Sequence, residues 1–265
     1  MTHIEDTYNY DRQYDINISE IHLDHRINPT VIRMYIGFYV PPMKYILQHM
    51  DSKPLICFGS CEGIDFTKYD FTNYIEEIYT DRSIECTLVD FTCFKNLLLF
   101  SSSYEPSISI TSLMLPSSLR TLHINGNQSL IGMNLPINLQ EISFSYNFDE
   151  HLLANIKFPV NLRHINFGII NKFINIVFPE EIEHITIYAK VIERKLIPFP
   201  PTLKKLTIHN SSVSLNDLPN SIEELNIMSV EQDVTNLPPS LQKIIVRRMP
   251  DDKIIKIRIE TSKKF

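Results

Sequence analysis

Residues 115–124, LPSSLRTLHI, set a pattern that the chain repeats six more times. The later copies are LPINLQEISF at 135–144, FPVNLRHINF at 158–167, FPEEIEHITI at 178–187, FPPTLKKLTI at 199–208, LPNSIEELNI at 218–227 and LPPSLQKIIV at 237–246. Each copy follows [L/F]-P-x-x-[L/I]-x-x-[L/I]-x-[I/F/V], and successive prolines are 19 to 23 residues apart. Seven copies at a nearly constant interval indicate a repeat protein, in which each unit stacks on its neighbours.

The end of each copy has the period of a β-strand. Its last two apolar residues are two positions apart, as Leu122 and Ile124 are, and a strand places such residues on one face. Isoleucine favours strands, whereas proline cannot donate to a central ladder, so each proline marks the turn that enters a strand. A repeat of about 20 residues is too short for two helices and fits one strand with a short return segment. We therefore predict a β-rich, leucine-rich-repeat-like solenoid, a right-handed superhelix with a curved parallel sheet.

The unit LPxSLxxLxI resembles the FNIP repeat, a leucine-rich-repeat-like family of social amoebae and giant DNA viruses. The similarity is good over residues 113–247 and looser over 70–265. Phe167-Gly168, followed by Asn171-Lys172-Phe173-Ile174, is similar to the longer family unit, but most copies lack this FN segment and its glycine. The resemblance therefore implies a divergent member. Asn127 and Asn147 fall where the leucine-rich-repeat consensus LxxLxLxxN has its asparagine, which in that family bonds backbone groups after the strand.

The sequence divides into three segments. Residues 71–249 are predicted to form the repeat solenoid, and they include two upstream units without proline, Ile75-x-x-Ile78 and Phe94-x-x-Leu97-x-Leu99. Residues 1–70 are predicted to be a divergent N-terminal cap or degenerate repeats, with strand-like runs VIRMYIGFYV and PLICF; a separate small domain is the alternative. Residues 250–265 are predicted to be a capping strand and a basic tail.

Composition excludes several classes of protein. The chain has 265 residues, 43% hydrophobic, with a net charge of −6 and only six Gly. No glycine-rich phosphate loop, N-terminal leader pattern or long apolar run occurs, so we expect a cytoplasmic protein (in the host cytoplasm if viral) without a membrane partner. Residues 241–265 carry a net charge of +5. That excess suits nucleic acid or an acidic partner, but it lacks interleaved aromatic residues, so we expect a solvated sheet edge and no nucleic acid.

Motifs for catalysis or cofactor binding are also missing. GxSxG and HExxH do not occur, and the four cysteines match no zinc spacing and lie in apolar runs that keep thiols protonated. We therefore expect no enzyme activity, no metal and no cofactor. The four cysteines are Cys57, Cys61, Cys86 and Cys93.

The exposed sheet face is the candidate functional surface, because solenoids commonly bind partners there. Alternate strand residues gather aromatic and basic side chains suited to anchoring a partner; the alternative is an ordinary solvated sheet face. We predict a non-catalytic protein–protein interaction scaffold with a protein partner. The family resemblance implies another role, substrate adaptor of a ubiquitin ligase, although no F-box is recognisable in the sequence. A structural component of a viral or cellular assembly is a further alternative. The predicted partner-binding residues are His164, His184, Tyr188, Lys205 and His209.

Overall fold

A computed structural model gives the fold of the chain. It describes residues 13–17, 31–36, 55–58, 65–68, 70–80, 89–102, 113–126, 129–145, 148, 153, 156–169, 176–188, 199–211, 218–230, 237–248 and 253–258. The chain forms two compact units, Met1–Leu139 and Gln140–Phe265. None of the helices in these described ranges is long and apolar enough to cross a membrane.

The first unit is a row of parallel strands. Its main sheet follows chain order, and each strand pairs in parallel with the next. The strands are β1 (Gln13–Asn17), β2 (Val31–Ile36), β3 (Leu55–Phe58), β4 (Glu77–Thr80), β6 (Leu99–Ser101) and β8 (Thr121–Ile124). A smaller parallel pair and two 3₁₀ helices complete the unit: β5 (Val89–Asp90), β7 (Leu113–Met114), η2 (Phe66–Lys68) and η3 (Asp70–Tyr74).

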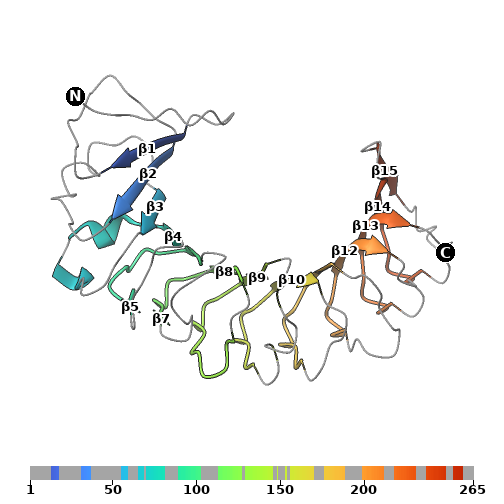
Figure 1. The fold of residues 1–265 in the computed structure, drawn as a ribbon. Helices are drawn as coiled ribbons and strands as arrows, with labels where there is room; N and C mark the ends of the chain where they lie inside the picture. Colours follow the sequence, from blue (N-terminus) through green and yellow to red (C-terminus); the bar gives the residue numbers. More distant parts are fainter. Residues whose placement is uncertain are drawn as a thin grey trace. The chain divides into compact units, whose positions relative to one another are not determined.

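The second unit continues the same repeat with six parallel strands and a final antiparallel one. In Figure 1, β12, β13 and β14 lie side by side in chain order in the orange and red part of the ribbon. The predicted parallel solenoid of about 20 residues per turn is thus confirmed. The strands are β9 (Glu141–Phe144), β10 (His164–Ile169), β11 (His184–Tyr188), β12 (Lys205–Ser211), β13 (Glu224–Val230), β14 (Lys243–Arg248) and β15 (Lys253–Arg258).

The predicted strand-like runs before residue 70 are confirmed at β2 and β3, which pair with each other. The three segment boundaries, and the choice between a cap and a separate domain for residues 1–70, stay predictions. The asparagines at 127 and 147 and the FN segment at 171–174 lie outside the described residues.

Each repeat proline begins a tight turn. In all seven copies its carbonyl oxygen accepts a hydrogen bond from the backbone N–H three residues later, over 3.0–3.3 Å; Leu203 N–H to Pro200 is one example. The turn ends at the first buried Leu or Ile of each copy, and the strand follows. Proline stabilises this turn because its ring fixes φ. The fixed φ reduces the conformational entropy of the unfolded chain more than that of the folded turn. The predicted role of the prolines at the strand entry is confirmed.

The upstream unit has phenylalanine where the others have proline. The N–H of Leu97 donates to the carbonyl of Phe94 over 3.2 Å, as in the proline turns. Phe100, not Leu99, then pairs with Leu122 in the next strand and is fully buried. The predicted spacing of core residues, Phe94-x-x-Leu97-x-Leu99, was therefore wrong in its last residue. The observed spacing is Phe94-x-x-Leu97-x-x-Phe100.

A hydroxyl ladder links successive turns. The residue two after the proline is Ser or Thr in four copies, and its hydroxyl donates to the carbonyl of the first core residue of the preceding repeat. Ser118 reaches Leu97 at 2.8 Å and Ser221 reaches Leu203 at 2.7 Å, and Thr202 and Ser240 do the same. These bonds satisfy carbonyls that the turn would otherwise leave without a partner.

The core consists of stacked apolar side chains at fixed repeat positions. Leu203, Leu206 and Ile208 of one repeat are at most 1% exposed. Burying a side chain of this size stabilises the fold by about 1.5–3 kcal/mol. Because each repeat supplies the same three positions, the core extends along each unit, as solenoid stacking requires.

Candidate functional site: the sheet face of the second unit

The sheet face of the second unit consists of the strand residues of β9–β14 that alternate with the core residues. Its first row pairs in register along Glu141, His164, His184, Lys205, Glu224 and Lys243. Its second row is Ser143, Asn166, Thr186, Thr207, Asn226 and Ile245. Its third row begins at Ile169 and continues with Tyr188, His209, Met228 and Arg247.

The start of the third row departs from simple alternation. Constant spacing would place Gly168 opposite Tyr188, but the register shifts within β10, and Ile169 takes that place. A residue inserted into one strand of a pair in this way is a β-bulge, which re-aims the side chains that follow it.

All five predicted binding residues lie on this face, in two groups. His164, His184 and Lys205 are consecutive in the first row. Tyr188 and His209 are neighbours in the third. Their role as a binding site stays a prediction.

Two pairs of rings stack across neighbouring strands. The His164 and His184 ring centroids are 4.0 Å apart with planes at 9°, and those of Tyr188 and His209 are 4.1 Å apart at 7°. Parallel strands in register lie about 4.8 Å apart, so rings at equivalent positions with equal rotamers must overlap. Each stack restricts the rotation of both rings.

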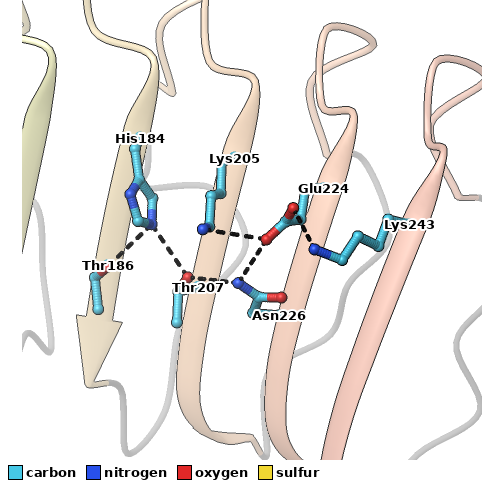
Figure 2. A network of polar contacts seen from close by, with 7 residues as sticks. All are labelled: His184, Thr186, Lys205, Thr207, Glu224, Asn226 and Lys243. Atoms are coloured by element: carbon cyan, nitrogen blue, oxygen red, sulfur yellow. Dashed lines mark hydrogen bonds and ion pairs between the residues drawn. The ribbon is translucent and has the colours of Figure 1, made fainter. Parts of the chain in front are cut away.

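A directional hydrogen-bond network joins the first two rows (Figure 2). Asn226 Nδ2 donates to Glu224 Oε1 at 3.1 Å and to Thr207 Oγ1 at 3.3 Å. The carboxylate accepts only, so it fixes which end of the Asn226 amide is the donor. Thr207 Oγ1 lies 3.2 Å and Thr186 Oγ1 lies 3.3 Å from His184 Nε2, and the tautomer of the ring decides which atom of each pair donates.

Glu224 is the charged centre of the network. Lys205 lies 3.1 Å from one carboxylate oxygen and Lys243 lies 2.8 Å from the other. Burial opposes ionisation of Glu224, but the hydrogen bonds from Lys243, Lys205 and Asn226 outweigh it and lower its pKa to about 2. The carboxylate is thus held ionised between two lysines.

His184 is held neutral. Burial, followed by the nearby His164 and Lys205, lowers the pKa of His184 to about 3. A neutral ring keeps one nitrogen as a hydrogen-bond acceptor, whereas a protonated ring has two donors and no acceptor.

Three buried side-chain atoms lack a hydrogen-bond partner among the described residues: His164 Nε2, Asn166 Oδ1 and Asn226 Oδ1. The Asn226 oxygen is assigned by the Glu224 contact described above. His164 Nδ1 lies 3.3 Å from Glu141 Oε1, so Nδ1 is the donor of that contact. Leaving such groups buried and unpaired costs roughly 1–3 kcal/mol each.

The sequence did not point to Asn166, Asn226, Glu141 or Glu224 as functional residues. All four occupy strand positions that alternate with the core, so their placement on this face could be predicted. Their selection could not, because it rests on contacts between strands that form only on folding, such as those of Glu224 with Lys205 and Lys243.

An exposed ion-pair cluster borders the face where the strands begin. Arg163 lies 3.3 Å from Glu183 and 3.5 Å from Glu181, and Lys204 lies 2.9 Å from Glu183. The hydrogen bond from Lys204 lowers the pKa of Glu183. These side chains are well exposed, so each pair contributes little to stability.

The described ranges contain no group of three or more His, Cys, Asp or Glu side chains placed to hold a metal. Cys93 has a free thiol whose pKa is raised by burial and by the nearby Asp90. A raised pKa keeps the thiol protonated and weakly nucleophilic.

Taken together, strand order, repeat turns and core define a leucine-rich-repeat-like parallel solenoid, a class that is typically non-catalytic. Within it, the FNIP Repeat family model matches residues 127–168, which confirms the FNIP resemblance there. The solved structure of CroV588, a protein of the giant virus CroV described as a novel circular LRR protein, is similar at a TM-score of 0.50 and 19% identity. That match covers 92% of this chain but only 42% of CroV588, so this chain spans less than half the length of its structural relative. No curated protein matches the sequence.

Proposed function

We propose that this protein is a non-catalytic interaction scaffold that binds a protein partner on the sheet face of its second unit. The observation that carries the proposal is the stacking of aromatic rings on that face, His164 on His184 and Tyr188 on His209, which holds flat side chains in fixed orientations. Tyrosine is common among the residues that anchor protein interfaces.

The same face is held rigid before binding. The two ring stacks and the network from Glu224 to His184 fix side chains that would otherwise lose rotamer freedom when a partner arrives. Preorganisation of this kind favours affinity because less conformational entropy is lost on association. The tyrosine and histidine rings of the third row add flat contact area.

Affinity capture with the full chain tests the proposal. Tyr188→Ala and His209→Ala remove the third-row stack, and we expect each to reduce recovery of the specific partner at least fivefold. Val177→Ala is the matched control, because Val177 is 77% exposed on the segment that enters the turn, away from the sheet face. Equal recovery by all three variants, with unchanged circular dichroism spectra, would reject the sheet face as the binding surface.

A further inference from the structure

The first and last strands of the chain each have one edge without a paired strand among the described residues. β15 pairs only with β14, and β1 pairs only with β2. The N–H and C=O groups along such an edge can pair with a strand of another chain. Both edges are therefore candidate interfaces, and neither contains a residue of the partner site proposed above.

The core is incompletely covered at the C-terminal end of the second unit. Val246 on β14 occupies a core position whose three equivalents on the preceding strands are at most 1% exposed, yet Val246 itself is only half-buried. The three equivalents are Ile187, Ile208 and Ile227. On β15, Ile255 is paired with Val246 and Ile257 with the core residue Ile244. Solenoids usually end in a cap with a polar outer face, so apolar residues at these positions suit the addition of a further strand.

The charges of the last two strands are all positive. β14 and β15 hold six Lys and Arg residues and no Asp or Glu. Opposite residues of an antiparallel pair belong to the same face, so the pairing of Arg258 with Lys243 places Arg258 and Lys256 on the side of the sheet face. A strand added to β15 would therefore have Ile255 and Ile257 as neighbours on its core side and basic residues as neighbours on its other side.

The first strand of the chain has the complementary pattern. The register from β1 through β2 and β3 to β4 aligns Ile16 with Ile78, which is fully buried. Tyr14 and Ile16 therefore occupy core positions, and Asp15 between them belongs to the opposite face. The sequence around this strand is acidic, because residues 1–24 contain six Asp and Glu and one Arg. β1 thus offers apolar residues on one side and a negative charge on the other.

We propose that copies of this chain associate head to tail, with β1 of one copy added to the free edge of β15 of another. Because β15 runs antiparallel to β14, an incoming copy whose strands follow the direction of β14 pairs its β1 antiparallel to β15. One register places all five residues of β1 opposite residues 254–258 and matches charge with charge and apolar with apolar, as cross-strand pairs require. The matched pairs in this register are Asp15 with Lys256, Ile16 with Ile255 and Tyr14 with Ile257.

The interface is heterologous, because the two surfaces in contact are different. Each contact leaves an unused β1 on one copy and an unused β15 on the other, and such contacts generate closed rings or open chains. A single added strand buries little surface, so we expect weak association with a Kd of roughly micromolar order. The expected state is a concentration-dependent mixture of monomers and larger species.

Sedimentation velocity of the full chain tests the proposal. We expect the weight-average mass to rise above the 30.9 kDa of one chain as the concentration increases, and to rise less at high salt, because salt screens exposed charges. Asp15→Lys and Lys256→Glu should each weaken association about fivefold or more, because each places like charges opposite one another. An equimolar mixture of the two variants should recover it, because every contact between unlike variants again joins opposite charges.

Glu181→Lys is the matched control. It changes the net charge by the same amount as Asp15→Lys, but Glu181 lies in a turn outside both strands, with 60% of its side chain exposed, so association should equal that of wild type. A monomer at every concentration overturns the proposal, as does equal association of Asp15→Lys and Glu181→Lys. Loss of association by both strand variants without recovery in the mixture also overturns it. Stronger association of Lys256→Glu than of wild type would show that this lysine blocks edge pairing, and would reject the proposal too.

Discussion

Glu224 provides the sharpest test of how the sheet face is held together. It is ionised between Lys205 and Lys243, and its carboxylate also fixes the amide of Asn226. Glu224→Gln keeps the size of the side chain and removes the charge. It leaves two lysine ammonium groups close together without their shared counterion, so we expect the fold to be less stable at neutral pH.

The magnitude follows from the pKa. The pKa of Glu224 falls from its ordinary value of 4.5 to about 2 in the folded chain. Each pKa unit corresponds to 1.36 kcal/mol, so the charged form contributes about 3 kcal/mol to stability at pH 7. The side chain is only 23% exposed, and solvent therefore screens the interaction less than it screens the ion pairs at the border of the face.

The sign of the pH dependence is fixed by the direction of the shift. A carboxylate with a lowered folded pKa contributes its full stabilisation above the unfolded pKa of 4.5, and loses it as the pH falls towards 2. At pH 3 the unfolded chain already binds the proton while the folded chain mostly does not, and about 1 kcal/mol remains. The difference between wild type and Glu224→Gln should therefore shrink from about 3 to about 1 kcal/mol between pH 7 and pH 3.

Urea denaturation followed by circular dichroism measures this difference, because the chain has no Trp to report by fluorescence. The matched control is Glu181→Gln: Glu181 is 60% exposed and 3.5 Å from Arg163, so its loss should cost less than about 1 kcal/mol at any pH. A constant gap between wild type and Glu224→Gln from pH 7 to pH 3 would refute the reasoning, as would a cost no larger than that of the control.

Three further outcomes follow from the structure. Leu206→Ala, in a fully buried core position, should lower the free energy of unfolding by about 2–5 kcal/mol in urea, against less than about 0.5 kcal/mol for Val177→Ala. The ring protons of His184 should keep their neutral chemical shifts from pH 8 down to pH 4.5 by NMR, because its pKa is about 3; a midpoint near 6.5 would contradict the network. Cys93 should react with iodoacetamide at pH 8 more slowly in the folded chain than in urea, as measured by peptide mass spectrometry, since burial raises its thiol pKa; equal rates would contradict that.

The fold could be predicted from the sequence because its physical causes are local. A proline, then a buried residue three positions later, then alternating apolar residues specify a turn and a strand in every copy. The spacing of core residues in the Phe94 unit was predicted wrongly because phenylalanine stands there in place of proline, although the backbone makes the same turn. The register shift between Asn166 and Ile169 could not be predicted, because a β-bulge adds one residue without breaking the apolar pattern around it.

The candidate site could be predicted only as a surface. Strand alternation placed His164, His184 and Lys205 side by side, and the register bears this out. The direction of the network is a different kind of fact. It depends on Glu224 accepting from Asn226 on its own strand, and on Thr207 accepting from the same amide on the neighbouring strand. No spacing in the sequence encodes which amide end faces which oxygen.

The network and the unmade hydrogen bonds act on the stability of the same face. Thr186 and Thr207 satisfy the His184 ring, so this repeat geometry can satisfy polar side chains within the face. Asn166 and Asn226 occupy equivalent row positions, where a threonine or serine with its smaller hydroxyl would fit, yet each leaves a buried oxygen unpaired. An unpaired buried acceptor lowers stability by roughly 1–3 kcal/mol, so the two oxygens offset part of what the network contributes to the same face.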